Sequence, residues 1–208
     1  MFDFDSHVAR KNPEAVIKAF EYAFPKSYQN SVSLVIKSIN GDRHLKEHKT
    51  LKKLIDGDPR IINIQKVLPH YENAALIHCC DCYVSLHRSE GFGLTIAEAM
   101  LTGKPVIITG YSGNLDFTTA QNSLLVDYQL VPVQMNYIFQ YSKGEMWSDP
   151  DIEQAGDHMR KLVRDTNFAC SFAKRGQELI RTSFSIEAVG KRYKNRLTKI
   201  LQHKTIDQ

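Results

Sequence analysis

Short apolar runs alternate with segments of helical periodicity along most of this chain. Such alternation is typical of β-α units that build a parallel sheet. Most of the runs are apolar at every position, as expected for strands that helices cover on both faces. The pattern therefore predicts an α/β fold with three layers, helices on both sides of a parallel sheet. The predicted strands are Phe2–Phe4, Val32–Ile36, Ile61–Ile64, Cys82–Leu86, Val106–Thr109 and Leu124–Val126.

Helix start and stop signals lie between the predicted strands. Asn12-Pro13 gives a cap followed by proline at the first helical position, and Pro25 ends the apolar stripe that follows. Gly57 and Gly103 stand where two further helices should end. Beyond the first, the predicted helices of this part are Asp42–Asp56, Pro69–Cys80 and Leu94–Thr102.

The character of the chain changes after Asp127. Tyr128–Ser148 has no clear period, which predicts a long irregular excursion. Three helices should follow, over Pro150–Asp165, Asn167–Thr182 and Ile186–His203. The last has an apolar stripe and a capping residue, Ser185, so we expect it to pack on an apolar surface. At 208 residues the chain is predicted to form one domain, residues 1–208, that includes these closing helices of residues 150–203.

Charge is unevenly distributed although the net charge is only +4. From His158 to Gln208 there are twelve Lys or Arg against four Asp or Glu. Such a segment could touch anionic lipid or nucleic acid, but its regular apolar stripe favours a solvated helix face. Met1–Asp5 lacks the features of a signal peptide. We therefore expect a cytoplasmic protein that binds no nucleic acid, with peripheral contact at the inner face of a membrane as the alternative.

Three of the four cysteines lie together in Cys79-Cys80-Asp81-Cys82, and the fourth is Cys170. A disulfide scaffold would spread them out, and a zinc site would need a second paired cluster. The pattern favours small buried thiols.

The segment from His87 to Met100 carries the most informative chemistry. It follows a predicted buried strand and opens a helix, so it lies at the carboxyl end of the sheet, where ligands bind. Gly91 and Gly93 let the backbone approach a ligand, and the free amides of Gly93 to Thr95 form an anion site at the helix N-terminus. Glu90 and Glu98 flank this site and suit a ligand rich in hydroxyl groups.

A dinucleotide-binding loop is the competing interpretation, because Gly91-x-Gly93 matches the first half of its fingerprint. The third glycine position would be Ile96, however, and the loop follows the fourth predicted strand rather than the first. His87 is the only histidine beside the motif, and a structural role is favoured over a catalytic one.

Several motifs together resemble the donor site of GT-B glycosyltransferases, closest to family 4. Glu90-Gly91-Phe92-Gly93-Leu94 and Glu98-Ala99-Met100 are similar to that family's pair of glutamates separated by seven residues. Gly103-Lys104-Pro105-Val106 and Tyr111-Ser112-Gly113-Asn114 resemble the turns that follow. Arg10-Lys11-Asn12-Pro13 resembles the basic turn after the first strand, and Phe184–Leu201 the closing helix.

This resemblance implies the Rossmann-like C-terminal domain of a retaining enzyme that binds a nucleotide sugar. Glu98 would hold the ribose and Glu90 the transferred sugar, while Lys11 and Arg10 would neutralise the diphosphate. The implied donor-binding set is Arg10, Lys11, Glu90, Gly91, Phe92, Gly93, Leu94, Thr95 and Glu98, with Glu90, Lys11 and Arg10 in catalysis. The family often has an arginine where Asp5 stands, so Arg10 is a candidate substitute. For both basic residues, a solvated helix start is the alternative.

The chemistry implied is stabilisation of negative charge on a leaving diphosphate, which fixed cations and a helix N-terminus favour. No Asp-x-Asp pair stands near the loop, so neither a metal nor another cofactor is expected. The resemblance also implies an N-terminal domain for a glycan or lipid-linked acceptor that this chain lacks. A non-catalytic subunit that works with a partner chain remains the alternative function.

Overall fold

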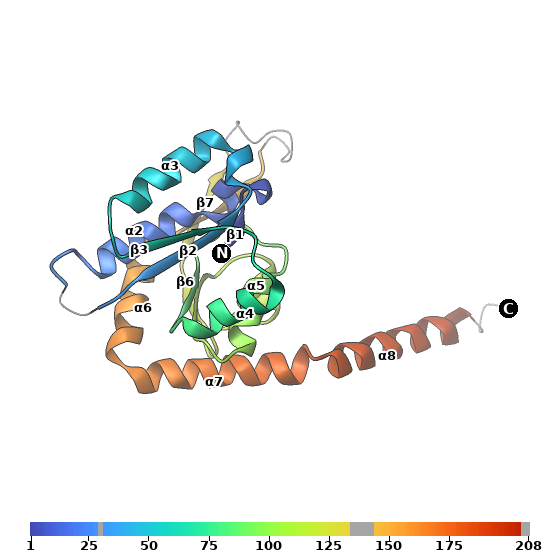
Figure 1. The fold of residues 1–208 in the computed structure, drawn as a ribbon. Coiled ribbons are helices and arrows are strands. Elements are labelled where there is room, and N and C mark those ends of the chain that lie inside the picture. Colours follow the sequence, from blue (N-terminus) through green and yellow to red (C-terminus); the bar gives the residue numbers. More distant parts are fainter. Residues whose placement is uncertain (29–30, 134–143, 205–208) are drawn as a thin grey trace.

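The computed structural model describes residues 1–28, 31–133 and 144–204. Figure 1 shows an α/β body from which the C-terminal helix projects. The first three strands, β1 (Phe2–Asp3), β2 (Leu34–Ile39) and β3 (Ile61–Gln65), pair in parallel in the order β1-β2-β3. The next three, β4 (Tyr83–Ser85), β5 (Val106–Thr109) and β6 (Leu124–Val126), form a second parallel group in the order β4-β5-β6.

All six predicted strands are present, with ends shifted by at most three residues. The predicted parallel arrangement of strands is confirmed, and in the described part of the chain the strands form two three-stranded groups. β1 pairs with β2 at Phe2–Ser38 and Asp3–Ile39.

Helices cover the sheets at the predicted places. α2 (Pro13–Ala23) packs against α3 (Leu45–Asp56) and α6 (Ile152–Arg164), whereas α5 (Leu94–Leu101) packs against α4 (His70–Cys79) and α7 (Thr166–Ser183). Short helical turns α1 (Val8–Lys11), η1 (Phe4–Ser6), η2 (Gly41–Arg43) and η3 (Gly113–Asp116) complete this part. The core is densest around β5, where Val106, Ile107 and Ile108 are fully buried.

The predicted irregular excursion after Asp127 is wrong at both of its ends. Tyr128–Pro132 forms β7 and Met146–Pro150 forms β8, and these strands pair antiparallel. The rest of the excursion includes residues 134–143, which lie outside the described residues. β7 is largely exposed, so its backbone pairing with β8 defines it rather than an alternation of apolar residues. In β8, by contrast, Trp147 and Ser148 are buried.

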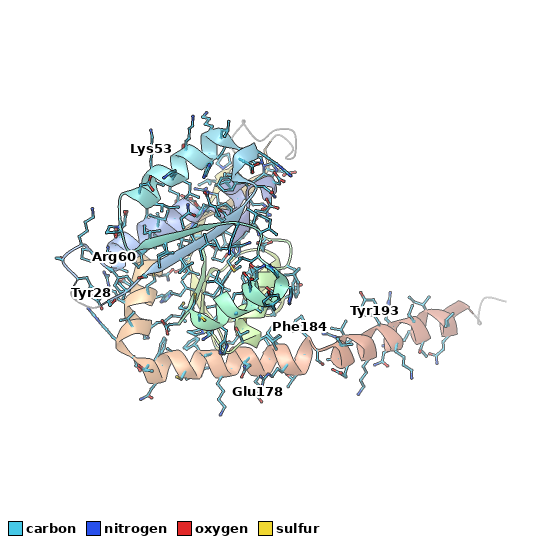
Figure 2. The ribbon with its side chains drawn as sticks, in the orientation of Figure 1. Tyr28, Lys53, Arg60, Glu178, Phe184 and Tyr193 are labelled. Atoms are coloured by element: carbon cyan, nitrogen blue, oxygen red, sulfur yellow. The ribbon has the colours of Figure 1, made fainter. Side chains whose placement is uncertain are left out.

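The last helix, α8 (Ile186–Lys204), has the predicted extent, and the Ser185 hydroxyl caps it by accepting the amide of Ala188. The expectation that its apolar stripe packs is not met in this structure. Ile186 is 88% exposed and Tyr193 68% exposed. Figure 2 shows Phe184 at the junction with α7 and Tyr193 on the projecting helix. In the described residues, no helix is long and apolar enough to cross a membrane.

The prediction of buried thiols is wrong for two of the four cysteines. Cys79 and Cys170 are exposed, while Cys80 and Cys82 are half-buried. Cys79 is the last residue of α4, and Cys170 lies in α7. Burial raises the pKa of the Cys82 thiol to about 12, so this thiol stays protonated.

Candidate functional site

The glycine loop, residues 89–93, connects β4 to α5 and is held from one side by the turn after β5. The Glu90 amide donates to the Ser112 hydroxyl (2.8 Å), and the Gly113 amide donates to the Glu90 carbonyl (2.9 Å). A Cβ on Gly113 would lie 1.9 Å from the Gly91 carbonyl oxygen, so only glycine fits. Ser112 itself has φ 73°, a region that favours glycine. The loop is therefore shaped by close contact between two backbones.

The basic turn packs against this loop from a position 79 residues earlier in the sequence. Arg10 donates to the Ser89 carbonyl (2.9 Å) and lies 3.5 Å from a Glu90 carboxylate oxygen. The Lys11 ammonium forms an ion pair with the other Glu90 oxygen. The backbone adds a further link, because the Arg88 amide donates to the Arg10 carbonyl (2.8 Å). The structure thus brings Arg10, Lys11 and Glu90 together, and the alternative of a solvated helix start does not describe either cation.

Glu90 is a half-buried carboxylate at the meeting point of two cations. Burial alone would raise its pKa, but the hydrogen bond from Lys11 and the charges of Lys11 and Arg10 outweigh burial and lower the pKa. Glu90 is therefore ionised at neutral pH. Its fixed negative charge holds two cations beside the loop.

Asp5 stands where the resembled family often has an arginine, and its side chain forms contacts away from the glycine loop. Its carboxylate pairs with Arg43 (2.9 Å) and accepts a hydrogen bond from His44 (2.8 Å). The His44 hydrogen bond is the main cause of a lowered pKa at Asp5. Because Asp5 is tied to the η2 region, its charge is satisfied away from Lys11 and Glu90.

The N-terminus of α5 presents free backbone amides beside the loop. Gly93 is the N-cap, with φ 91° and no side-chain capping bond, and Ile96 and Ala97 donate to its carbonyl. The amides of Leu94 and Thr95 precede the first complete turn, so they are free to meet an anion. Within the described structure Glu98 is exposed and takes part in no ion pair, in contrast to Glu90.

Two predicted donor-site side chains have structural contacts. Phe92 packs between Phe117 (ring centroids 4.9 Å apart) and Phe184 (6.0 Å). The Thr95 hydroxyl accepts a hydrogen bond from Tyr83 (2.8 Å), whose buried hydroxyl has a pKa raised to about 12 by burial. Both contacts anchor the start of α5 to the core.

His87 is fully buried beneath the loop. Its Nε2 lies 3.0 Å from Asn114 Oδ1 and 3.2 Å from the Tyr111 carbonyl, and its Nδ1 lies 3.1 Å from the Ser85 hydroxyl. Two acceptors at Nε2 require a proton there. Burial lowers the pKa of His87, which favours the neutral ring, and in that form Nδ1 accepts a hydrogen bond from the Ser85 hydroxyl. This geometry supports the structural role over the catalytic one.

Sequence reasoning missed Arg88, which connects three segments. Its guanidinium donates to the Ala9 carbonyl (3.0 Å) and to Asp149 of β8 (2.8 Å), and it lies 5.4 Å from the Trp147 ring centroid. Ser148 of β8 also donates to the Arg88 carbonyl (2.9 Å). The only signal in the sequence was its place directly before Ser89, because β8 itself was not predicted.

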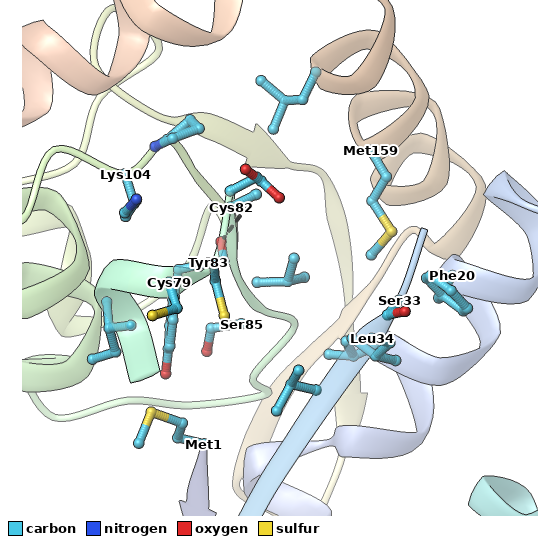
Figure 3. Close-up of a pocket in the computed structure, with 18 of the residues that line it drawn as sticks. Met1, Phe20, Ser33, Leu34, Cys79, Cys82, Tyr83, Ser85, Lys104 and Met159 are labelled. Atoms are coloured by element: carbon cyan, nitrogen blue, oxygen red, sulfur yellow. Dashed lines mark hydrogen bonds between the residues drawn. The ribbon is translucent and has the colours of Figure 1, made fainter. Parts of the chain in front are cut away.

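A cavity of about 820 Å³ lies below the site, between the two sheets. Figure 3 shows Met1 at its border, with Tyr83 and Ser85 on one side and Leu34 on the other. Lys11, Glu90 and Thr95 also line it, so the cavity reaches the candidate site.

This geometry agrees with comparisons to known proteins. The family model "Glycosyl transferases group 1" matches residues 6–179. The chain belongs to this glycosyltransferase family. None of the curated proteins matches its sequence. The matched region runs from the turn before Arg10 to the penultimate helix, and it includes the whole candidate site.

Solved structures of similar fold include HepE from Anabaena in complex with UDP and glucose, at TM-score 0.66 and 19% identity over 91% of this chain and 45% of that one. The C-terminal domain of a glycosyl transferase group 1 protein from Francisella tularensis has TM-score 0.64 and 21% identity, over 89% of this chain and 84% of that one. A GtfA/B complex has TM-score 0.68 and 16% identity, over 92% and 34%. The chain thus has the three-layer α/β/α fold of GT-B C-terminal domains and spans less than half the length of HepE.

Proposed function

We propose that this chain is the donor-binding part of a retaining glycosyltransferase of the family 4 type, which transfers a sugar from a nucleoside-diphosphate sugar to a glycan or lipid-linked acceptor. The observation that carries the proposal is the meeting of Arg10, Lys11 and Glu90 beside the free N-terminus of α5. Cations and helix amides at one point are what a diphosphate requires. HepE, of similar fold, is bound to UDP and glucose, which supports this ligand class.

In this proposal Lys11, Arg10 and the amides of Leu94 and Thr95 receive the diphosphate. As the bond from the anomeric carbon to the phosphate oxygen breaks, negative charge grows on the leaving group, and these fixed groups stabilise it more strongly than the ground state. Glu98, exposed on α5, takes the ribose hydroxyls, and Glu90 takes hydroxyls of the transferred sugar. No metal is needed, because the protein's own cations neutralise the phosphates.

The acceptor would bind to another domain, facing this one across the donor site. Since catalysis depends on holding both reactants together, the chain by itself should bind nucleotide without transferring sugar. Radiolabelled donor with mixed acceptors measures transfer, and robust transfer would contradict this division. The alternative is a non-catalytic subunit that works with a partner chain. The GtfA/B complex, which contains a chain of similar fold, supports this alternative.

The deciding experiment is calorimetric titration with UDP, with and without EDTA. We expect the same affinity in both. Lys11→Gln should weaken binding about 10- to 100-fold, since it removes a charged hydrogen bond of roughly 1.5–3 kcal/mol. Lys18→Gln is the matched control, because Lys18 pairs with exposed Glu14 on the same stretch of chain. Equal affinities for the two variants, or a large loss on chelation, would contradict the proposed phosphate site.

A further inference from the structure

α1 carries Arg10 and Lys11 and has little stability of its own. The residues that flank it both have positive φ, His7 at 64° and Asn12 at 51°. That region is unfavourable for residues other than glycine. A helix of one turn also fixes several backbone angles for very few hydrogen bonds. Contacts from elsewhere in the fold must therefore hold this turn in place.

Arg88 meets the carboxyl end of α1, where the last carbonyls have no partner within a helix. Its guanidinium Nη1 donates to the Ala9 carbonyl (3.0 Å), and its backbone amide donates to the Arg10 carbonyl (2.8 Å). Basic side chains often satisfy the last carbonyls of helices in this way. Arg88 thus caps the turn that bears both cations of the site, from a position 79 residues beyond Ala9.

β8 fixes the orientation of the Arg88 guanidinium. Asp149 Oδ1 accepts hydrogen bonds from Nε (3.2 Å) and from Nη2 (2.8 Å). The planar guanidinium also lies over the Trp147 ring, 5.4 Å from its centroid. Ser148 donates its amide (3.0 Å) and its hydroxyl (2.9 Å) to the Arg88 carbonyl. Arg88 is therefore tied to β8 through its side chain and through its backbone.

We propose that Arg88 is a positioning residue, which holds α1 so that Arg10 and Lys11 receive the diphosphate. Asp149 in turn holds Arg88. This role rests on the proposed function, because it concerns where the phosphate-binding cations lie. Charge-assisted hydrogen bonds depend on distance and direction, so a shift of α1 by about 1 Å would weaken them.

Arg88 need not touch the ligand to act in this way. All three of its guanidinium nitrogens already donate, one to the Ala9 carbonyl and two to Asp149. Its effect on a bound diphosphate passes through α1, and substitution should therefore weaken phosphate binding alone.

The test compares Arg88→Met with Arg160→Met. Arg160, on α6, is a matched control because it also donates to a backbone carbonyl (Tyr22, 3.0 Å), pairs with a carboxylate (Asp157) and lies over an aromatic ring (4.6 Å). The Arg88 and Arg160 side chains are 25% and 26% exposed. By calorimetry, Arg88→Met should bind UDP about tenfold more weakly than the wild type, and Arg160→Met should bind it equally well.

Uridine separates positioning from a general disturbance of the fold. It has the base and ribose of UDP but no phosphate, so Arg88→Met should bind uridine as the wild type does. A loss confined to UDP would support the positioning role. Equal losses for uridine and UDP, or an unchanged affinity for UDP, would overturn it.

Hydrogen exchange tests the cap without a ligand. The amides of Lys11 and Asn12 donate to carbonyls one turn earlier. They should exchange at least about tenfold faster in Arg88→Met and at the wild-type rate in Arg160→Met, because only the first variant loses the cap. Unchanged exchange in Arg88→Met would overturn the proposal.

Asp149→Asn sharpens the same measurement. It should speed exchange in α1 by a smaller factor, and it should add nothing to Arg88→Met, since the two side chains act as one unit. Additive effects would mean that Asp149 does not act through Arg88. If the wild-type chain bound no UDP, the proposed function would fail, while exchange would still decide whether Arg88 holds α1.

Discussion

The two sides of the glycine loop differ in how tightly the protein holds them. On the side of η3, Gly113 touches the Gly91 carbonyl, Ser112 accepts the Glu90 amide, and buried His87 lies beneath. On the other side Gly91 has open space at its Cβ position, and Leu94 is 69% exposed. A donor site needs both properties, because the packed side fixes the loop while the open side leaves groups free for the ligand.

The largest expected effect breaks the packed side. Gly113→Ala forces a Cβ into the Gly91 backbone, and neither backbone can move without breaking its hydrogen bonds, so we expect a loss of about 3 kcal/mol of stability. Gly91→Ala is the matched control on the open side, where no atom lies within 4 Å of the added carbon. Thermal denaturation should show a drop of roughly 6–12 °C for the first and little change for the second. Similar drops would mean that the two sides are equally packed.

A second comparison separates the two glutamates by their neighbours. Glu98→Ala should weaken UDP and UDP-sugar alike by roughly 1.5–3 kcal/mol, because it removes charge-assisted hydrogen bonds to the ribose. Glu90→Ala should leave UDP binding at least as strong, since Lys11 and Arg10 lose their carboxylate partner, while binding of the intact nucleotide sugar weakens. Calorimetry measures both. A loss of UDP affinity in Glu90→Ala would make Glu90 a strut of the loop rather than a sugar ligand.

Acid should loosen the packed side through His87. Burial lowers the pKa of His87 in the folded chain below its ordinary 6.5, so the unfolded chain takes up the proton first. Stability is therefore present above pH 6.5 and declines as the pH falls below it. His87→Asn should be less stable at pH 8 but lose this decline. Urea denaturation between pH 8 and pH 5.5 tests it, and parallel pH profiles would show that His87 is not responsible.

The smallest expected effect concerns Ser112, whose hydroxyl and backbone act in opposite directions. Ser112→Ala should cost about 1 kcal/mol, because it removes the acceptor for the Glu90 amide and keeps the unfavourable φ. Ser112→Gly also removes the acceptor, but glycine adopts this positive φ without strain, so its net loss of stability should be smaller. If denaturant titrations ranked Gly below Ala, the strain would contribute nothing measurable.

The sequence predicted the local elements well, because apolar runs and helix caps are local signals. Ile61–Gln65 and Val106–Thr109 appear where their β-branched runs indicated. It could not predict the pairing of β7 with β8, since most of β7 is exposed and its residues do not alternate.

The site shows the same contrast between local sequence signals and contacts that depend on distant segments. Glu90, Lys11 and Arg10 were predicted from motifs and are brought together. The role of Arg88 depends on β8, 61 residues away, and the φ of Ser112 depends on contact with the loop. Neither feature produces a motif of fixed spacing that one sequence could reveal.

The uneven exposure of the cysteines gives the chain two intrinsic labelling positions. Cys79 and Cys170 are exposed, whereas the half-buried Cys82 thiol has a raised pKa, which makes it a poor nucleophile toward maleimides. Both exposed residues line the cavity, from α4 and α7 respectively. Environment-sensitive fluorophores attached there would report on the space between the sheets without any engineered mutation.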